Sequence, residues 1–511
     1  MADIFLEQSK IIANNFIQNI VFIDDKAYKS DSTNNSFDTS SISKIFAKAD
    51  KICAIYAPES VSDITCYDKI LRKADVVILD WRLDIRCNDD DIDSEADAEY
   101  DEPRGEFTLK LISNLVSQKG MLKLIIIYTG ETNLFDITDN IYSKIEKYGE
   151  FCKTECTIQS ANVKILVRAK SQNSDNQFAY VPELKDKIVD IEQLPTLILD
   201  EFTNMTNGLL SNFALAAISA IRNNTSRILS VFSPKLDPAY LGHKINLPDS
   251  NDAKKFIIQL FGDAITELLE NENIDTRKWV ENWIHYRIEN KTLSIAGKDL
   301  SINKEILCKI VDSEALDLNT KIYECTKKNI GKKASKFASH LFQYGDINID
   351  ESNIEFAKLT HHKNVFLPKK NKPLLTLGTI IRCIANNNYY ICIQQRCDSV
   401  RINGDRRFLF LPLDPDEEHY SIIINKNLKF KINPKAYAIK TIKFKVADNE
   451  QAIYATKNPE GKYIFTSIYP DKYEWVIDLK EMHAQRILNN YCAELSRVGL
   501  NESEWLRLMS K

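Results

Sequence analysis

Acidic, hydroxyl and amino side chains follow directly on short apolar runs at several places in the first 170 residues. The residues concerned are Asp24, Asp25, Asp80, Thr129 and Lys170. Three carboxylates, a hydroxyl and an ammonium group suit a divalent cation together with a phosphoryl group. Carboxylate oxygens are hard ligands of the kind that Mg²⁺ prefers, and the cation would let one aspartate attack phosphorus as a nucleophile. Lysine and the hydroxyl would then bind the phosphoryl oxygens during an in-line transfer.

The apolar runs before these residues are short and rich in Val and Ile. They are Ile20–Ile23, Val76–Leu79, Leu122–Tyr128 and Val163–Val167, with Lys51–Tyr56 as a further candidate. Runs that are apolar on both faces are typical of parallel strands covered by helices. They predict a doubly wound, flavodoxin-like α/β sheet, whose ligands bind at the carboxyl ends of the strands. We therefore expect the polar side chains to meet at that edge.

Helix capping is the plainer explanation for the aspartates, because Asp is favoured at the start of helices that follow strands. Capping does not require a lysine and a threonine at the two remaining strand ends, so we favour the phosphoryl site. The register of the last strand stays open between two lysines. If Lys170 is not the lysine of the site, Lys164 is the alternative.

The ordered set resembles the receiver domain of bacterial two-component response regulators. Receivers have an acidic pair after the first strand, a phospho-accepting Asp after the third, Ser or Thr after the fourth and Lys after the fifth. The resemblance implies that Asp80 accepts a phosphoryl group from a sensor histidine kinase, that Thr129 hydrogen-bonds it and that Lys170 pairs with it. The implied ligands of Mg²⁺ are Asp24, Asp25, Asp80 and the main-chain carbonyl of Arg82.

The sequence departs from the usual receiver around the fifth strand. Ser171 follows the lysine, where receivers usually have proline, and Val167 occupies a position that is often aromatic. The strand ends are also further apart in sequence than in a compact receiver, which indicates insertions. Because Val167 is small and β-branched, with few rotamers, we expect phosphoryl binding to exert little leverage on distant surfaces.

The continuation of the chain is similar to the divergent response receiver family of bacterial anti-phage operons. The segments that carry this similarity are Leu194–Thr203, Met205–Leu210 and Leu236–His243. In the two-component-like systems called Detocs, a sensor histidine kinase acts with two receiver proteins. One carries a nucleotide-destroying effector domain, and the other is thought to absorb phosphoryl groups. No enzyme signature follows the receiver region here, so the resemblance implies the phosphate-absorbing kind, with the kinase and a second receiver-effector protein as partners.

These observations predict a receiver protein that is not an enzyme, apart from assisting its own phosphorylation and dephosphorylation. The alternative is a phosphorylation-gated effector whose C-terminal half binds nucleic acid or a partner protein. A Mg²⁺-dependent phosphatase with an aspartate nucleophile would share the carboxylates. Such phosphatases usually have an acid/base Asp two residues after the nucleophile, where this sequence has Arg82.

Periodicity divides the chain into four stretches. Residues 1–190 predict the receiver-like α/β domain with insertions, and residues 191–245 predict a helical extension, with one long helical pattern over 192–232. Residues 246–362 again show a helical pattern. Residues 363–511 shift towards a period of two, which predicts a β-rich domain of about six strands with a C-terminal helix.

Composition limits the partners and the location. The net charge of −5 gives the molecule no overall attraction to nucleic acid or anionic lipid. No apolar stretch approaches the ~20 residues that cross a bilayer, and no secretory signal is visible. The eleven cysteines include no close CxxC pair and do not form a disulfide framework. We expect a cytoplasmic protein without membrane or nucleic-acid partners, and the sequence leaves its oligomeric state open.

Several weaker motifs favour structural explanations. Lys29–Ser43 predicts a polar loop, and Asn88–Glu102, with nine acidic residues, predicts a solvated loop rather than a calcium site. His361 and His362 would point in different directions on a helix, so we predict no metal there. Lys426–Lys445 contains seven lysines and no acid. We favour lysines that protect an edge strand over a groove for a polyanion, because the aromatic residues alternate onto the buried side.

Overall fold

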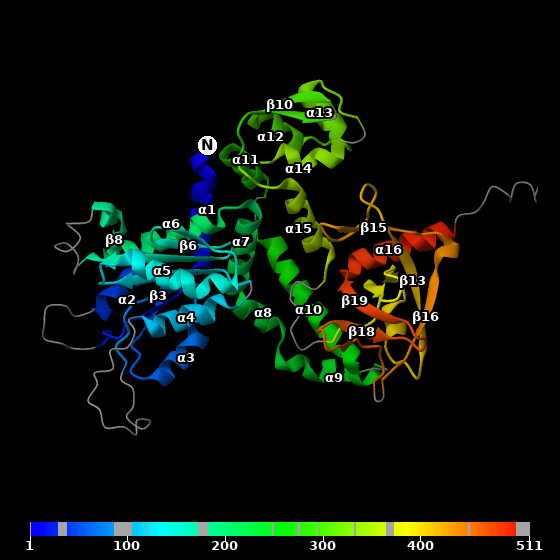
Figure 1. The fold of residues 1–511 in the computed structure, drawn as a ribbon, viewed down its shortest axis with the longest axis horizontal. Coiled ribbons are helices and arrows are strands. Elements are labelled where there is room, and N and C mark those ends of the chain that lie inside the picture. The colour runs from blue at the N-terminus through cyan, green and yellow to red at the C-terminus, as the bar shows by residue number, and fades with distance from the viewer. Residues whose placement is uncertain are drawn as a thin grey trace, which may run out of the picture. The chain divides into compact units, whose positions relative to one another are not determined.

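The computed structural model divides the chain into two compact units, residues 1–288 and residues 289–511 (Figure 1). The structure describes residues 2–28, 38–85, 105–118, 120–171, 182–247, 250–272, 276–295, 297–331, 334–363, 372–447 and 450–496. The acidic segment Asn88–Glu102 lies outside these residues. The four-part division drawn from periodicity stays a prediction.

The described part of the first unit contains an eight-stranded sheet in the order β2-β1-β3-β4-β7-β6-β5, with β8 beside the end of β7. The strands are β1 (Asn19–Ile23), β2 (Ile52–Tyr56), β3 (Val76–Leu79), β4 (Lys123–Thr129), β5 (Cys152–Thr154), β6 (Thr157–Gln159), β7 (Val163–Lys170) and β8 (Ile188–Val189). The neighbours β2, β1, β3, β4 and β7 are all parallel. The predicted doubly wound sheet is confirmed. The antiparallel hairpin of β5 and β6 was not predicted, because its strands are only three residues long.

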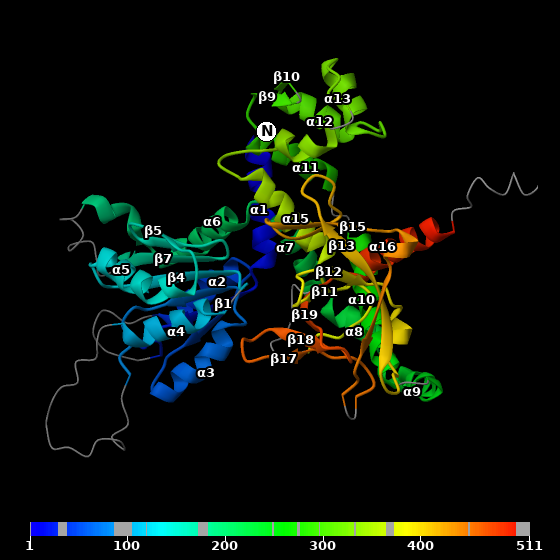
Figure 2. The same ribbon diagram turned by 45° about the vertical axis from the view of Figure 1, so that its right-hand side comes forward.

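Helices cover both faces of this sheet, as its two-sided apolar strands require (Figure 2). One face packs against α3 (Val61–Leu71), α4 (Glu106–Val116) and α5 (Leu134–Ile145). The other face packs against α1 (Ala2–Phe16), α2 (Thr39–Lys48), α6 (Leu194–Thr206) and α7 (Leu209–Asn223). Helices α6 and α7 therefore share a hydrophobic core with the strands that end at the candidate site.

The start of α2 corrects the predicted polar loop at Lys29–Ser43. Residues 39–43 are helical, and the carboxylate of Asp38 caps the helix by accepting the main-chain N–H of Ser41 at 3.1 Å. Ile42 and Phe46 are buried against the sheet. The loop prediction was wrong there because the Ser- and Thr-rich start of the segment hid a narrow apolar stripe.

The long helix predicted over 192–232 is divided into α6, α7 and α8 (Thr225–Val231). The first break falls at Asn207-Gly208, two residue types with low helix propensity. Three more helices, α9 (Asp237–Asn246), α10 (Ser250–Asn271) and α11 (Thr276–Arg287), follow in this unit. Helix α11 packs on α1, where the rings of Phe5 and Tyr286 lie 5.3 Å apart.

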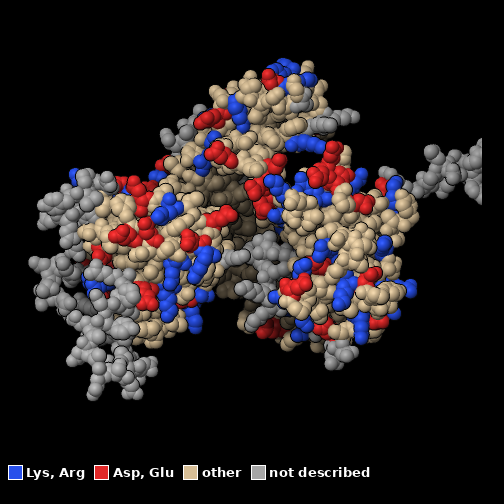
Figure 3. Space-filling model, viewed as in Figure 1, with Lys and Arg blue, Asp and Glu red and all other residues tan. Residues whose placement is uncertain are grey.

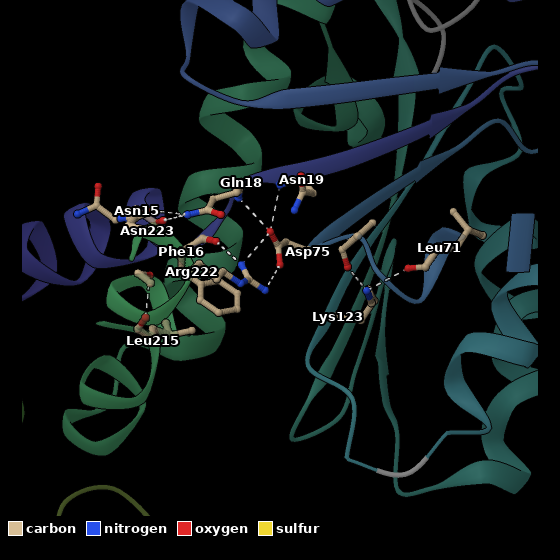
Figure 4. Close-up of polar contacts among 12 residues, drawn as sticks. Asn15, Phe16, Gln18, Asn19, Leu71, Asp75, Lys123, Leu215, Arg222 and Asn223 are labelled. Atoms are coloured by element: carbon tan, nitrogen blue, oxygen red, sulfur yellow. Dashed lines mark hydrogen bonds and ion pairs between the residues drawn. The ribbon is translucent and has the colours of Figure 1, made fainter. Parts of the chain in front are cut away.

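A partly buried ion pair joins the end of α7 to the amino edge of the sheet (Figure 4). Asp75 accepts the main-chain N–H groups of Gln18 and Asn19 at 2.9 and 3.0 Å. Its two oxygens lie 2.9 and 3.2 Å from the guanidinium of Arg222, which also donates to the carbonyl of Phe16 at 2.9 Å. Because the Asp75 side chain is only 4% exposed, loss of the guanidinium would leave a poorly solvated carboxylate.

Lys123 lies at the same edge, at the start of β4. Its ammonium group donates to the main-chain carbonyls of Leu71, at 3.1 Å, and Ala74 (Figure 4). Burial lowers the pKa of Lys123 to about 8. The amine thus binds the carbonyl of the last residue of α3, which has no N–H partner further along the helix, and a carbonyl just beyond it.

We predict that Arg222→Ala lowers the free energy of unfolding by about 1–3 kcal/mol, because it strands the buried Asp75 carboxylate. Urea unfolding of the full chain would measure the change. Arg227→Ala, on the exposed surface of α8, is the matched control and should change stability by less than about 0.5 kcal/mol. Equal effects of the two substitutions would contradict a stabilising role for this ion pair.

In the second unit, an antiparallel hairpin interrupts the region predicted to be helical. Its strands are β9 (Lys291–Ile295) and β10 (Lys298–Ile302). Gly297 lies in the turn with a φ of +75°, a conformation that glycine adopts readily. Helices α12 (Lys304–Asp312), α13 (Leu318–Thr326), α14 (Ala338–Leu341) and α15 (Ile349–His361) follow. The alternation of this hairpin spans too few residues to stand out within a longer helical pattern.

The rest of this unit contains a sheet of nine described strands, which confirms the predicted β-rich domain but exceeds the six or so strands expected. They are β11 (Thr379–Cys383), β12 (Tyr389–Cys392), β13 (Arg406–Pro415), β14 (Ile422–Asn425), β15 (Leu428–Ile432), β16 (Lys440–Phe444), β17 (Thr456–Lys457), β18 (Tyr463–Thr466) and β19 (Lys472–Asp478). Helix α16 (Glu481–Leu495) packs on one face. Nowhere in the described ranges does a helix have the length and apolar character needed to cross a membrane.

Candidate active site at the carboxyl edge of the sheet

Asp24, Asp25 and Asp80 lie together where β1 and β3 end side by side. The parallel register pairs Ile23 with Leu79, so the residues that follow are level with each other. The main-chain N–H of Asp80 donates to the carbonyl of Ile23 at 2.9 Å, which extends this register by one residue. One carboxylate oxygen from each aspartate lies within 4.8 Å of the others. The three residues are only 0, 2 and 5% exposed, so water screens their mutual repulsion poorly.

Lys170, the last residue of β7, extends its amine into this cluster. Its Nζ lies 2.7 Å from Asp24 Oδ2 and 3.1 Å from Asp80 Oδ1. Lys164, near the other end of the same strand, pairs with Glu201 of α6 instead. The structure therefore places Lys170, and not Lys164, beside the aspartates.

Burial governs the proton affinities in this cluster. Burial, together with the charges of Asp24 and Asp25, raises the pKa of Asp80 to about 6, although the Lys170 ammonium offsets part of this increase. For Lys170, burial would lower the pKa, but the charges of Asp80 and Asp24 outweigh burial and raise it. Lys170 therefore stays positively charged at neutral pH, whereas Asp80 takes up a proton near pH 6.

Thr129 lies at the end of β4, the strand between β3 and β7. The residue is buried, and its hydroxyl oxygen accepts the main-chain N–H of Glu131 at 3.1 Å. In the parallel register it is level with Ala169, one residue before Lys170. The ends of β1, β3, β4 and β7, which carry the predicted site residues, therefore lie at the same edge of the sheet.

The loop after Asp80 is anchored by residues that the sequence did not single out. Thr108 donates its hydroxyl to the Asp80 carbonyl at 2.9 Å. Trp81 is buried against Gly105, where a Cβ atom would come within 2.3 Å of the indole ring. Gly105 also has a φ of +87°, so both its backbone and its lack of a side chain suit this packing. The side chain of Arg82 pairs with Asp84 at 2.8 Å.

Tyr128 is a further residue that sequence reasoning missed. Its hydroxyl donates to the Val189 carbonyl on β8 at 2.8 Å, and the amine of Lys170 lies 5.8 Å from its ring centroid. Burial raises its pKa, which keeps the phenol protonated as a donor. A tyrosine at the end of an otherwise aliphatic buried run was the available sequence indication, since a buried hydroxyl needs a partner.

The donor set fits Mg²⁺. Three buried carboxylates share one described ammonium group within contact distance, so negative charge remains in excess at a site of hard oxygen ligands. Burial is the main cause of the raised pKa of Asp80, and a divalent cation would offset the part that comes from repulsion by Asp24 and Asp25. The residues present are therefore compatible with the cation that the sequence predicted.

A comparison with protein families agrees with this geometry. The family described as "Response receiver domain" matches residues 16–175. Residues 16–175 are a receiver domain. The match includes every residue of the carboxyl-edge site but covers less than a third of the chain. A search of curated proteins gives no match.

A receiver domain is the part of a two-component system that interacts with a histidine kinase or another phosphotransfer partner. The order of strands in this receiver places the aspartates of β1 and β3 next to each other and brings the lysine of β7 to them. The receiver-domain prediction is confirmed, while the roles of the individual residues stay predictions.

The lysine-rich segment 426–445 does not form one basic surface. It runs as β15 and β16 along one side of β13, where Lys431 is level with Asp414 and Lys443 lies 3.5 Å from Asp405. Over this sheet, blue and red side chains are interspersed on the face in Figure 3. Tyr437 is 85% exposed, so the expectation that the aromatic residues are buried holds for Phe430 and Phe444 but was wrong for this loop residue.

The raised pKa of Asp80 predicts a pH-dependent stability in buffers without divalent cations. The folded state holds this proton up to about pH 6, whereas an unfolded aspartate releases it near 3.8. Stability that is present below pH 3.8 is therefore lost as the pH rises to 6. Asp80→Asn should remove that loss and raise the free energy of unfolding at pH 7.5 by about 1–3 kcal/mol, with a much smaller gain at pH 4.

Urea unfolding of the full chain in EDTA at both pH values measures this difference. Asp263→Asn, which changes an exposed carboxylate on α10, is the control and should leave stability nearly unchanged at both. A variant at Asp80 that is no more stable than the wild type at pH 7.5 would show that burial and neighbouring charges do not destabilise the ionised carboxylate as described.

Proposed function

We propose that this receiver accepts a phosphoryl group on Asp80 from a sensor histidine kinase, and that it acts as a phosphate sink in anti-phage two-component signalling. The observation that carries the proposal is the contact of one ammonium group with both Asp24 and Asp80 inside a buried carboxylate cluster. In the transfer, the N–P bond of the kinase phosphohistidine breaks and an O–P bond forms at Asp80. The histidine nitrogen then regains a lone pair.

Each residue of the site has a separate role in this transfer. Asp80 must be ionised to act as a nucleophile, and the contact with Lys170 favours that state. Lys170 then remains available to pair with the phosphoryl oxygens, and the hydroxyl of Thr129 can donate to one of them. Mg²⁺, held by Asp24, Asp25, Asp80 and the main-chain carbonyl of Arg82, would supply the positive charge that offsets repulsion between carboxylates and phosphoryl oxygens.

The packing around Val167, behind the site, favours storage of the phosphoryl group over transmission of a signal. Val167 is fully buried in the core between β7 and the helices α4 and α5. A β-branched side chain in a packed core has few rotamers through which to respond. The proposed anti-phage role, and the proposed partnership with a second receiver-effector protein, rest on the sequence similarity of segments between residues 194 and 243. We also propose that the protein has no output enzyme activity and acts in the cytoplasm.

The alternative, a gated effector that binds nucleic acid, gains no support from the lysine-rich segment. Its lysines are distributed among acidic and aromatic partners, including Asp405, Tyr390 and Tyr420. We therefore retain the phosphate sink as the proposed function.

Acetyl phosphate with a ³²P label tests the acceptor without knowledge of the kinase. The wild type should become labelled only with Mg²⁺, and hydroxylamine should release the label as expected for an acyl phosphate. Asp80→Asn should abolish labelling. Lys170→Ala should slow it by about 10²-fold, since it removes the charge that meets the phosphoryl oxygens. Lys164→Ala changes a lysine of the same strand away from the site and should label normally.

Two further variants separate metal binding from phosphoryl acceptance. Asp24→Asn and Asp25→Asn should raise the Mg²⁺ concentration needed for half-maximal labelling while leaving the acceptor in place. Stable label in Asp80→Asn, or a larger effect of Lys164→Ala than of Lys170→Ala, would overturn the assignment of the site.

Hydrogen exchange with Mg²⁺ and beryllofluoride tests storage against switching. If the receiver stores phosphoryl groups, new protection should be confined to the loops after β1, β3, β4 and β7, because Val167 transmits little movement. Asp80→Asn should show no new protection. Large changes in residues 246–511, or a change from monomer to dimer, would refute storage and favour the gated effector.

A further inference from the structure

Two histidine rings join the end of α15 to the start of α16 in the second unit. The rings of His361 and His483 are stacked, with centroids 3.9 Å apart and planes inclined by 23°. The backbone supports the same junction, since the N–H of Lys480 donates to the His361 carbonyl at 2.7 Å. The side chain of Lys480 also donates to the carbonyl of Leu359 at 2.6 Å. The position of His483 beside His361 was not predicted, because the two residues lie far apart in the chain.

The protonation state of His483 follows from its neighbour. Nδ1 of His483 lies 2.8 Å from a terminal nitrogen of Arg486. Arginine has only donors, so this Nδ1 must accept and therefore carries no proton. The neutral ring then bears its proton on Nε2, which is buried and has no hydrogen-bond partner among the described residues. A second proton on this ring would have to bind Nδ1, which faces a guanidinium cation.

His362 provides an internal contrast. It is as buried as His483, at 7% exposure, but its Nε2 lies 2.8 Å from the carbonyl of Ile423 on β14. A carbonyl can only accept, so His362 donates there and can gain a proton on Nδ1 without losing this bond. Burial lowers the pKa of both histidines, but only His483 would lose a hydrogen bond on gaining its second proton.

Two of the three acidic side chains near this junction already pair with a cation, which limits their compensation of a protonated ring. The cations are Lys358, Lys480 and Arg486, and the acids are Glu355, Asp478 and Glu481. Glu355 already pairs with Lys358 at 2.6 Å, and Glu481 pairs with Arg396. Burial, with the positive charges of His361 and Arg486, lowers the pKa of His483 to about 4.

We propose that His361 and His483 form an acid-sensitive clasp that releases the first turns of α16 when His483 gains a proton on Nδ1. The proton would break the contact with Arg486 and place two cations against each other. Because Ala484, Ile487 and Leu488 bury the apolar face of α16 against the sheet, release would expose part of that core. This device is independent of the receiver site and of the proposed phosphoryl transfer.

Hydrogen exchange of residues 481–495 in the full chain, corrected for intrinsic rates, tests the clasp. A lowered pKa gives stability that is present above pH 6.5 and lost as the pH falls towards 4. The opening equilibrium of α16 should therefore increase about 3- to 30-fold from pH 7.5 to pH 5.0. His483→Gln keeps an acceptor for Arg486 but cannot titrate, so it should remove most of this increase. His362→Gln should retain it.

An increase that is absent from the wild type, or equal in His483→Gln, would overturn the proposal. If His483→Gln fails to fold, ¹⁵N-histidine NMR of the wild type still decides. One histidine should keep an unprotonated Nδ1 at pH 5.5 and lose it together with the protection of α16. Titration of every ring near pH 6.5 would refute the clasp.

Discussion

The contact of Lys170 with Asp24 and Asp80 is the interaction on which the carboxyl edge of the first sheet depends. Two carboxylates less than 5 Å apart repel each other by about 3–4 kcal/mol at an effective dielectric constant of ~20. The shared ammonium offsets part of this repulsion, but burial and the neighbouring carboxylates still raise the pKa of Asp80. The receiver is thus built around an unbalanced charge that a cation, a proton or a chemical modification can relieve.

The sequence predicted the features that follow from strand topology. Runs that are apolar on both faces had to be parallel strands, and parallel strands end at one edge, so Asp24, Asp80 and Lys170 were expected together. The pairing of Asp75 with Arg222 was out of reach, because the two residues are 147 positions apart and neither lies in a recognisable motif. Short hairpins such as β9–β10 were missed because five alternating residues do not outweigh a surrounding helical pattern.

The helices after the receiver strands are part of the same folded body. Ile198 and Phe202 of α6 and Leu215 of α7 are buried in one cluster with Phe22 and Ile78 of the sheet. The family match ends at residue 175, before these helices begin. The hydrophobic core therefore extends beyond the stretch that the family describes, and the face of the sheet covered by α1 and α2 is completed by residues outside the match.

Strand β3 is bracketed by two buried aspartates, Asp75 before it and Asp80 after it, with four apolar residues between them. Each carboxylate has fixed partners at its own edge of the sheet, Arg222 at one and Lys170 at the other. A slip of the strand by one residue would draw one carboxylate into hydrocarbon and turn the apolar side chains to the opposite faces. The length of β3 therefore fixes the distance between the two carboxylates. Related sequences should show substitutions among Val, Ile and Leu at positions 76–79, but no insertions or deletions there.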